Sequence, residues 1–267
     1  MSIFNLEFKQ RKKSYFIWLS ICIILSILFM LLYQAVTGGV IDQEIFLKSV
    51  SIANVLGFEN VISDYTHFDS YFIYFYQYIF LIQCVFCVLL GVDILRKEEM
   101  NNTIQYLYSM PISRSKIYFS KYISALLLYT IFLLITWIVF FCLIAVLQSS
   151  FISTLFFTQK VWLLIFYTYL IGAAYLTLGL FVSLLLKTSA NSVITGIILF
   201  LIIYIIGFSK ELEYFSLYKY INPGRYLYSF HIFKAVLLIS IIIVLLIAGL
   251  IIYIKRDFKI NKKRSKV

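Results

Sequence analysis

Charged residues are scarce in this chain. Asp, Glu, Lys and Arg make up 13% of its 267 residues, whereas 63% are hydrophobic and the mean hydropathy is +0.96. Soluble domains carry about 25% charged residues, so this composition excludes a soluble domain of comparable size. The sequence therefore predicts an all-α, polytopic membrane protein, and no linker divides residues 1–267 into more than one domain.

Ionisable residues are absent from the longest hydrophobic runs. Ion-coupled carriers keep such residues inside the membrane, so this absence argues against a secondary transporter. It also argues against a cation channel lined by charged side chains, although a filter of backbone carbonyls would need none. A G-x-x-x-x-G-K-[ST] motif is absent as well, so the chain has no P-loop with which to bind ATP.

Cysteine and histidine residues are too few and too scattered for a metal site. Cys84 and Cys87 form a C-x-x-C pair, but both lie within one hydrophobic run, and no second pair or neighbouring histidine completes a zinc site. We interpret them, together with Cys22 and Cys142, as apolar residues of the hydrophobic runs. The sequence predicts no catalytic, metal or cofactor site in this chain.

Six hydrophobic runs are each long enough to cross a bilayer, which takes about 20 mainly apolar residues. The predicted spans cover residues 15–36, 71–91, 122–147, 161–186, 192–208 and 235–254. The segment 1–14 is basic and mildly amphipathic, and it is predicted to form a helix that lies at the membrane interface before the first span.

Lys and Arg are distributed unevenly between the segments that join the spans. If both termini are cytosolic, residues 1–14, 93–121, 187 and 255–267 hold 17 of the 23 basic residues, and the external segments hold 6. Cytoplasmic loops carry the excess of Lys and Arg, so this orientation is predicted, in the plasma membrane. The net charge of +11 follows from this orientation and from attraction to anionic lipid, and it requires no nucleic-acid partner.

The longest charged segment between two spans is residues 96–121. Its apolar residues recur at helical spacing: Met100, Ile104, Leu107 and Tyr108. This spacing predicts a short amphipathic helix over residues 98–109, held between the second and third spans. A helix that simply lies on the membrane surface would show the same pattern, so periodicity alone leaves both interpretations open.

Start and stop signals frame this predicted helix. Glu98 and Glu99 are expected in its first turn, where acidic side chains favour the helix dipole. Pro111 ends it, because proline lacks the amide donor and disfavours a helical residue before it. Ser113 or Ser115 can then cap a second helix that leads into the third span.

The literal sequence of this segment resembles the loop after the second span of ABC-2-type permeases. In that family the loop has an acidic residue, Gly-Thr, a leucine-rich turn, Pro-Ile-Ser-Arg and a lysine at the third span. The matching residues here are Glu98, Glu99, Thr103, Leu107, Pro111, Ile112, Ser113, Arg114 and Lys121. Asn102 departs from the pattern, since the family usually has glycine at that position.

The resemblance covers nearly the whole chain. Segment 1–14 is similar to the elbow helix that opens ABC-2 permeases, residues 178–196 resemble the junction of the fourth and fifth spans, and residues 220–223 resemble the proline motif before the last span. The fold that this implies has six transmembrane helices, the interfacial elbow helix, a cytosolic coupling helix in the loop 93–121 and a basic cytosolic tail, residues 255–267.

By this resemblance the chain is the permease subunit of an ATP-driven transporter, and an exporter. It implies a second permease, identical or different, and ATP-binding subunits that hold the ATP and Mg²⁺. The residues that the resemblance implies to contact an ATP-binding subunit are Glu98, Glu99, Asn102, Thr103, Leu107, Pro111, Ser113, Arg114, Lys187 and Asn191. The rival interpretation is a non-transporting membrane scaffold or immunity protein, which needs no such partner.

Two further patterns in the spans bear on the cargo. Tyrosines are abundant in the second and fourth spans: Tyr74, Tyr76, Tyr78, Tyr167, Tyr169 and Tyr175. Their faces and hydroxyls suit an amphipathic cargo such as a membrane-active peptide, a lipid-like molecule or a hydrophobic drug, but they would equally serve to pack helices. Small residues form one stripe on the fourth span: Thr168, Gly172, Gly179 and Ser183. The stripe is predicted to pack closely against neighbouring helices rather than to line a conduit.

Overall fold

The computed structural model describes residues 3–39, 68–100, 113–147, 159–186, 189–206 and 232–255. Side chains are described throughout these ranges except at residues 3–10, 69–70, 73, 96–100, 159–160 and 189–191. The regular elements in this part of the chain are all α-helices: α1 (Ile3–Thr37), α3 (Phe68–Met100), α5 (Arg114–Leu147), α7 (Gln159–Leu185), α8 (Ser189–Ile206) and α10 (Ile232–Lys255). The predicted all-α fold is confirmed.

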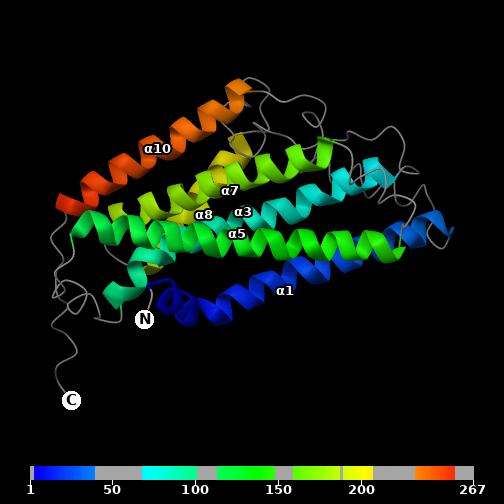
Figure 1. Cartoon of the computed structure of the whole chain (residues 1–267), viewed down its shortest axis with the longest axis horizontal. Helices are drawn as coiled ribbons and strands as arrows, with labels where there is room; N and C mark the ends of the chain where they lie inside the picture. The colour runs from blue at the N-terminus through cyan, green and yellow to red at the C-terminus, as the bar shows by residue number, and fades with distance from the viewer. Residues whose placement is uncertain are drawn as a thin grey trace, which may run out of the picture.

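The helices lie side by side in an elongated bundle, and successive helices run in opposite directions (Figure 1). Helices α1, α3, α5, α7 and α10 are each long and apolar enough to cross a membrane. Helix α8 is shorter, with 18 residues, or about 27 Å at 1.5 Å per residue, just under a hydrocarbon core of about 30 Å. The predicted number of apolar helices is therefore present, with five of full spanning length.

Helix boundaries differ from the predicted spans mainly at one end of the bundle. Helix α1 begins at Ile3 and continues to Thr37, so the predicted interfacial segment is helical and joins the first span as one element. Helix α3 continues past residue 91 as far as Met100. As a result Arg11, Asp93 and Lys121 belong to helices, and the absence of ionisable residues applies only to the middle of each helix.

Helices α3 and α7 are the most buried of the spanning helices, and their backbones touch. A Cβ atom added to Gly91 of α3 would overlap the carbonyl oxygen of Leu176, and one added to Gly179 of α7 would overlap that of Val88. Small residues permit this approach because no side chain separates the helix axes. The prediction that the small residues of α7 serve close packing within the subunit is confirmed at Gly179.

Two tyrosines of α5, Tyr129 and Tyr118, each lie over a glycine of a neighbouring helix. The Tyr129 hydroxyl donates a hydrogen bond to the Thr168 carbonyl oxygen of α7 at 2.9 Å, and a Cβ atom at Gly172 would overlap that hydroxyl. The Tyr118 hydroxyl donates to the Leu246 carbonyl oxygen of α10 at 3.3 Å, above Gly249. Helix α5 is thus joined to both α7 and α10 by a tyrosine that donates to a backbone carbonyl and lies over a glycine.

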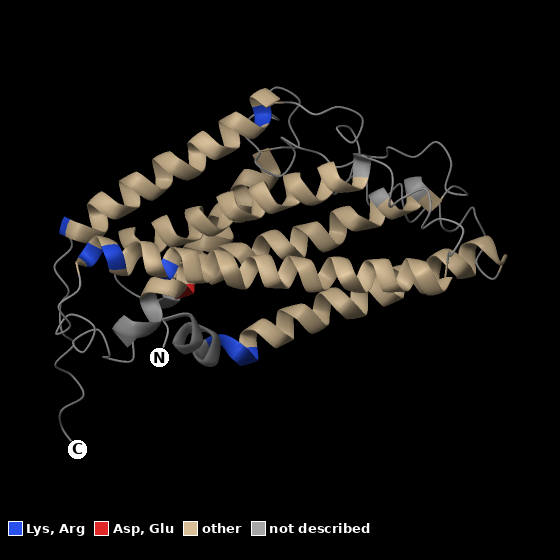
Figure 2. Ribbon diagram, in the orientation of Figure 1, with Lys and Arg blue, Asp and Glu red and all other residues tan. Residues whose placement is uncertain are grey.

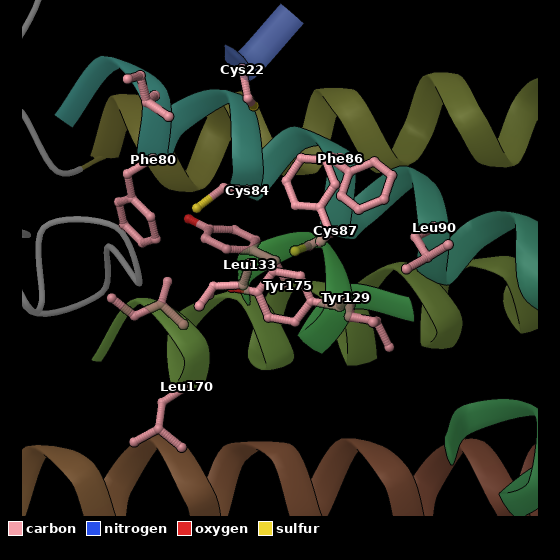
Figure 3. Packing of buried hydrophobic residues seen from close by; sticks show 14 of the residues in the cluster. Cys22, Phe80, Cys84, Phe86, Cys87, Leu90, Tyr129, Leu133, Leu170 and Tyr175 are labelled. Carbon is pink, nitrogen blue, oxygen red and sulfur yellow. The ribbon is translucent and has the colours of Figure 1, made fainter. Parts of the chain in front are cut away.

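The interior between these helices is apolar and aromatic. Cys22, Cys84 and Cys87 are buried there, close to Tyr129 and Tyr175 (Figure 3). Cys142 is exposed on the outside of the bundle, as expected for a residue of a membrane-spanning face. The interpretation of the first three cysteines as apolar core residues is confirmed by this placement.

The α3–α7 contact generates a stability prediction. In the Gly179→Ala variant the new methyl group meets a backbone carbonyl, which cannot move without separating the two helices, so we expect unfolding to become easier by about 1–3 kcal/mol. Thermal unfolding of the purified protein in lipid nanodiscs measures this loss. The matched control is Gly196→Ala, whose methyl meets only side-chain methyl groups of Val88 and Val92, both at 3.1 Å. Equal unfolding temperatures for the two variants would contradict the backbone contact.

Candidate functional site

Segment 96–121, which the sequence predicts to be cytosolic, begins in α3 and ends in α5 at one end of the bundle. The start of α1, the end of α3, the start of α5 and the end of α10 all lie there (Figure 1). Most of the described basic side chains gather at the same end, on α1, α5 and α10, while Lys234 lies at the opposite end (Figure 2). This end of the bundle is therefore the candidate functional site.

Ser113 occupies the N-cap position of α5. The Ser113 carbonyl oxygen accepts the first backbone hydrogen bond of the helix, from the Ile117 amide at 3.2 Å, which puts Ser113 at the N-cap position. The Ser115 hydroxyl lies inside the first turn and donates to the Ser113 hydroxyl at 3.4 Å. Of the two serines that the sequence left open, Ser113 is the cap.

Arg114 joins the start of α5 to the end of α10. Its Nη1 donates a hydrogen bond to the Ile254 carbonyl oxygen at 2.8 Å. Ile254 precedes the last residue of α10, Lys255, so its carbonyl is one of those that a helix leaves without an internal partner. A cation at this position also complements the negative end of the helix dipole.

The placement predicted for Glu98 and Glu99 is wrong. The helix that contains them begins at Phe68, so both residues lie at the C-terminal end of α3 rather than in the first turn of a separate helix. The apolar run of the second span extends through Ile94 and Leu95, and helical structure propagates from it into the charged residues that follow. Their proximity to a helix N-terminus, and the dipole stabilisation inferred from it, therefore do not apply.

Two cations at this end, Lys121 and Arg11, are buried, which the sequence analysis did not predict. The Lys121 side chain is 2% exposed, and its Nζ donates to the Ile94 carbonyl oxygen of α3 at 3.2 Å. The Arg11 side chain is 4% exposed, and its Nη1 approaches the Leu90 carbonyl oxygen at 3.5 Å. The sequence did contain a signal for Lys121, because it lies at helical spacing from the apolar residues Ile117, Tyr118 and Ala125, which the structure shows to be buried.

Several predicted contact residues lie outside the described part of the chain. These are Asn102, Thr103, Leu107, Pro111 and Lys187. Asn191 lies in the first turn of α8, and residues 186–188 separate α7 from α8. The structure therefore brings Ser113 and Arg114 of the predicted set to the bundle end where α3 and its glutamates terminate.

The tyrosines proposed for cargo are largely enclosed within the bundle. Tyr74, Tyr76 and Tyr175 are buried, and the Tyr76 ring lies 5.1 Å from that of Trp137 between ring centroids. The hydroxyls of Tyr74 and Tyr78 share a hydrogen bond of 2.8 Å. Inside the bundle, Gln83 Nε2 of α3 also donates a hydrogen bond to the Thr136 hydroxyl of α5 at 3.4 Å. In this conformation the rings act as helix packing, which was one of the two interpretations left open.

Comparison with known families decides the class of protein. The sequence profile of the ABC-2 family transporter proteins matches residues 1–258. This chain belongs to the ABC-2 transporter family. It is a multi-pass membrane permease of an ABC transporter, and the ATP-binding subunit of such a transporter is its implied partner. No protein of curated function matches the chain at a significant level.

In this permease the described ionisable groups lie near the helix ends, outside the apolar middle of the bundle. A transport subunit that leaves ATP hydrolysis to a partner needs a contact surface for that partner rather than a nucleotide site. In this permease the candidate surface is the end where α3 stops, α5 starts and the described basic side chains of α1, α5 and α10 are concentrated. The ABC-2 match thus agrees with the resemblance read from segment 96–121.

Proposed function

We propose that this ABC-2 permease exports hydrophobic or amphipathic cargo across the plasma membrane. It works as one of two permeases, each served by an ATP-binding subunit at the cytosolic end. Its termini and segment 93–121 are cytosolic, and ATP and Mg²⁺ are bound by the partner subunits. The observation that carries this proposal is that the start of α1, the end of α3, the start of α5 and the end of α10 lie at one end of the bundle, together with most of the described basic side chains.

The coupling residues are proposed to act through rigid helix ends. Residues 101–112 lie in the sequence between the end of α3 and the start of α5, so a partner bound to them would act on both helices. Ser113 fixes the first turn of α5, and Arg114 ties that turn to α10. We infer that Glu98, Glu99, Asn102, Thr103, Leu107 and Pro111 form the main contact with the ATP-binding subunit, with Lys187 and Asn191 as the smaller one.

The middle of the bundle supports an apolar or amphipathic cargo. Between the charged ends the six helices contain no Asp, Glu, Lys, Arg or His, so a small charged solute would meet no fixed partner for its charge. Hydroxyl, amide and aromatic groups are present instead, as in the contact between Gln83 and Thr136. Because the tyrosines are enclosed, cargo contact with them requires the helices to separate during the transport cycle.

Charge reversal at the end of α3 tests the coupling contact. Lysines in place of Glu98 and Glu99 stand at a helix C-terminal end, which the helix dipole favours, so the double variant is expected to fold. The proposed contact pairs these glutamates with basic groups of the ATP-binding subunit, and juxtaposed like charges across an interface cost several kcal/mol, so co-purification of that subunit should fall more than about tenfold. The neutral Glu98→Gln/Glu99→Gln variant is the matched control and should retain part of the binding. Wild-type binding by the lysine variant would favour the surface-helix interpretation.

The cargo class is tested with inside-out vesicles that contain the permease and its ATP-binding subunit. A fluorescent cationic amphipathic peptide or a fluorescent phospholipid should be moved to the far side or leaflet when ATP is present, whereas radiolabelled glucose should not accumulate. Vesicles with the Glu98→Lys/Glu99→Lys variant should show no ATP-dependent step. Accumulation of glucose without any movement of the amphipathic probes would refute the cargo class. ATP hydrolysis that moves none of the probes would instead favour the non-transporting scaffold.

A further inference from the structure

A buried lysine of α5 is hydrogen-bonded to α3 near the point where the two helices meet the segment that joins them. Lys121 lies on α5, eight positions into the helix when Arg114 is counted as the first, and its ammonium donates to the Ile94 carbonyl oxygen at 3.2 Å. The two residues are 27 positions apart, on either side of the segment that is proposed to contact the ATP-binding subunit. This one hydrogen bond therefore links the two helices that emerge from that segment.

Burial of this ammonium is not needed for membrane orientation. Lysine is almost never fully buried unless it is paired, because its ammonium is compact and strongly hydrated. The neighbouring bases that set the charge asymmetry, Lys12, Lys13, Lys116 and Lys255, are exposed. Only Lys121 of the described lysines is buried in this way. Its position thus indicates a role between helices in addition to its charge.

Helices α1, α5 and α7 all contact the stretch of α3 that accepts the Lys121 hydrogen bond. Arg11 of α1 approaches the Leu90 carbonyl oxygen at 3.5 Å, one helical turn before Ile94. Between these two carbonyls lies Gly91, which brings the backbone of α3 against Leu176 of α7. Helices α1, α5 and α7 therefore all meet α3 within residues 90–94. A displacement of the end of α3 must move these neighbours or break the contacts.

We propose that Lys121 is a positioning residue for coupling. Its bond to Ile94 keeps the cytosolic ends of α3 and α5 together, so that a force on the intervening segment moves both helices, and Arg11 extends the linkage to α1. A carbonyl acceptor suits this role, since the flexible lysine stem can follow a moving backbone while keeping the bond. The inference rests on the proposed function, because the force is supplied by an ATP-binding subunit.

Three variants separate this role from simple structural support. Lys121→Met removes the donors and keeps an unbranched apolar stem, Lys121→Arg keeps a cation of similar reach, and Lys234→Met removes a base from the start of α10, at the opposite end of the bundle. Hydrogen–deuterium exchange of the permease alone, in nanodiscs, reports on the backbone of residues 90–100. Steady-state ATP hydrolysis by the complex with the ATP-binding subunit gives kcat and KM for ATP.

The expected result is a specific loss of coupling in one variant. Lys121→Met should raise exchange in residues 90–100 and lower the permease-dependent kcat about tenfold, as expected when a hydrogen bond from a charged group is lost. KM for ATP should not change, because the nucleotide binds to the other subunit. Lys121→Arg should restore most of the kcat, and Lys234→Met should match the wild type in both measurements.

Each alternative result has its own meaning. Wild-type exchange in Lys121→Met would overturn the linkage between α3 and α5, whether or not an ATP-binding subunit is present. Raised exchange with an unchanged kcat per folded complex would reduce Lys121 to a structural residue and overturn its coupling role. If the wild-type permease itself gives no permease-dependent hydrolysis, the proposed function fails instead, and the exchange measurement still decides whether Lys121 holds the two helices together.

Discussion

The close contact between α3 and α7 is the constraint on which the rest of the bundle depends. Gly91 and Gly179 let the two backbones meet along the centre of the molecule, and side chains at these positions would force them apart. Lipid provides no hydrophobic driving force between helices, so association relies on close packing and on hydrogen bonds. The other helices are arranged around this pair, and α10 is the least buried of those long enough to span a membrane.

Helix α5 is connected to its neighbours in a way that suits transmission of movement. Tyr118 and Tyr129 attach it to α10 and α7 through hydroxyls that stand above glycines, and Arg114 and Lys121 attach its first turns to α10 and α3. All four bonds end on backbone carbonyls, so they depend on helix position rather than on a partner side chain. A shift at the start of α5 would therefore displace or strain its contacts with α3, α7 and α10.

The sequence predicts those features that depend on local chemistry. Apolar length gives the spans, the residues around Pro111 give a serine cap at the start of α5, and the small residues of the fourth span indicate close packing. It does not predict which basic residues are buried, because Arg11, Lys12 and Lys13 look alike until packing fixes the rotation of α1. Local charge also does not show where a helix stops. The charged residues after the second span are predicted to begin a new helix, but α3 continues through Glu98 and Glu99.

The central claim is that the segment between α3 and α5 contacts an ATP-binding subunit. Site-specific photocrosslinking from Leu107, replaced by a benzoylphenylalanine, tests this directly in membranes that contain the permease and the subunit. We expect a covalent adduct between the two chains, with none from Ile62, which the charge asymmetry places on the external side. Crosslinks from Leu107 to lipid alone, with no adduct to the ATP-binding subunit, would contradict the account.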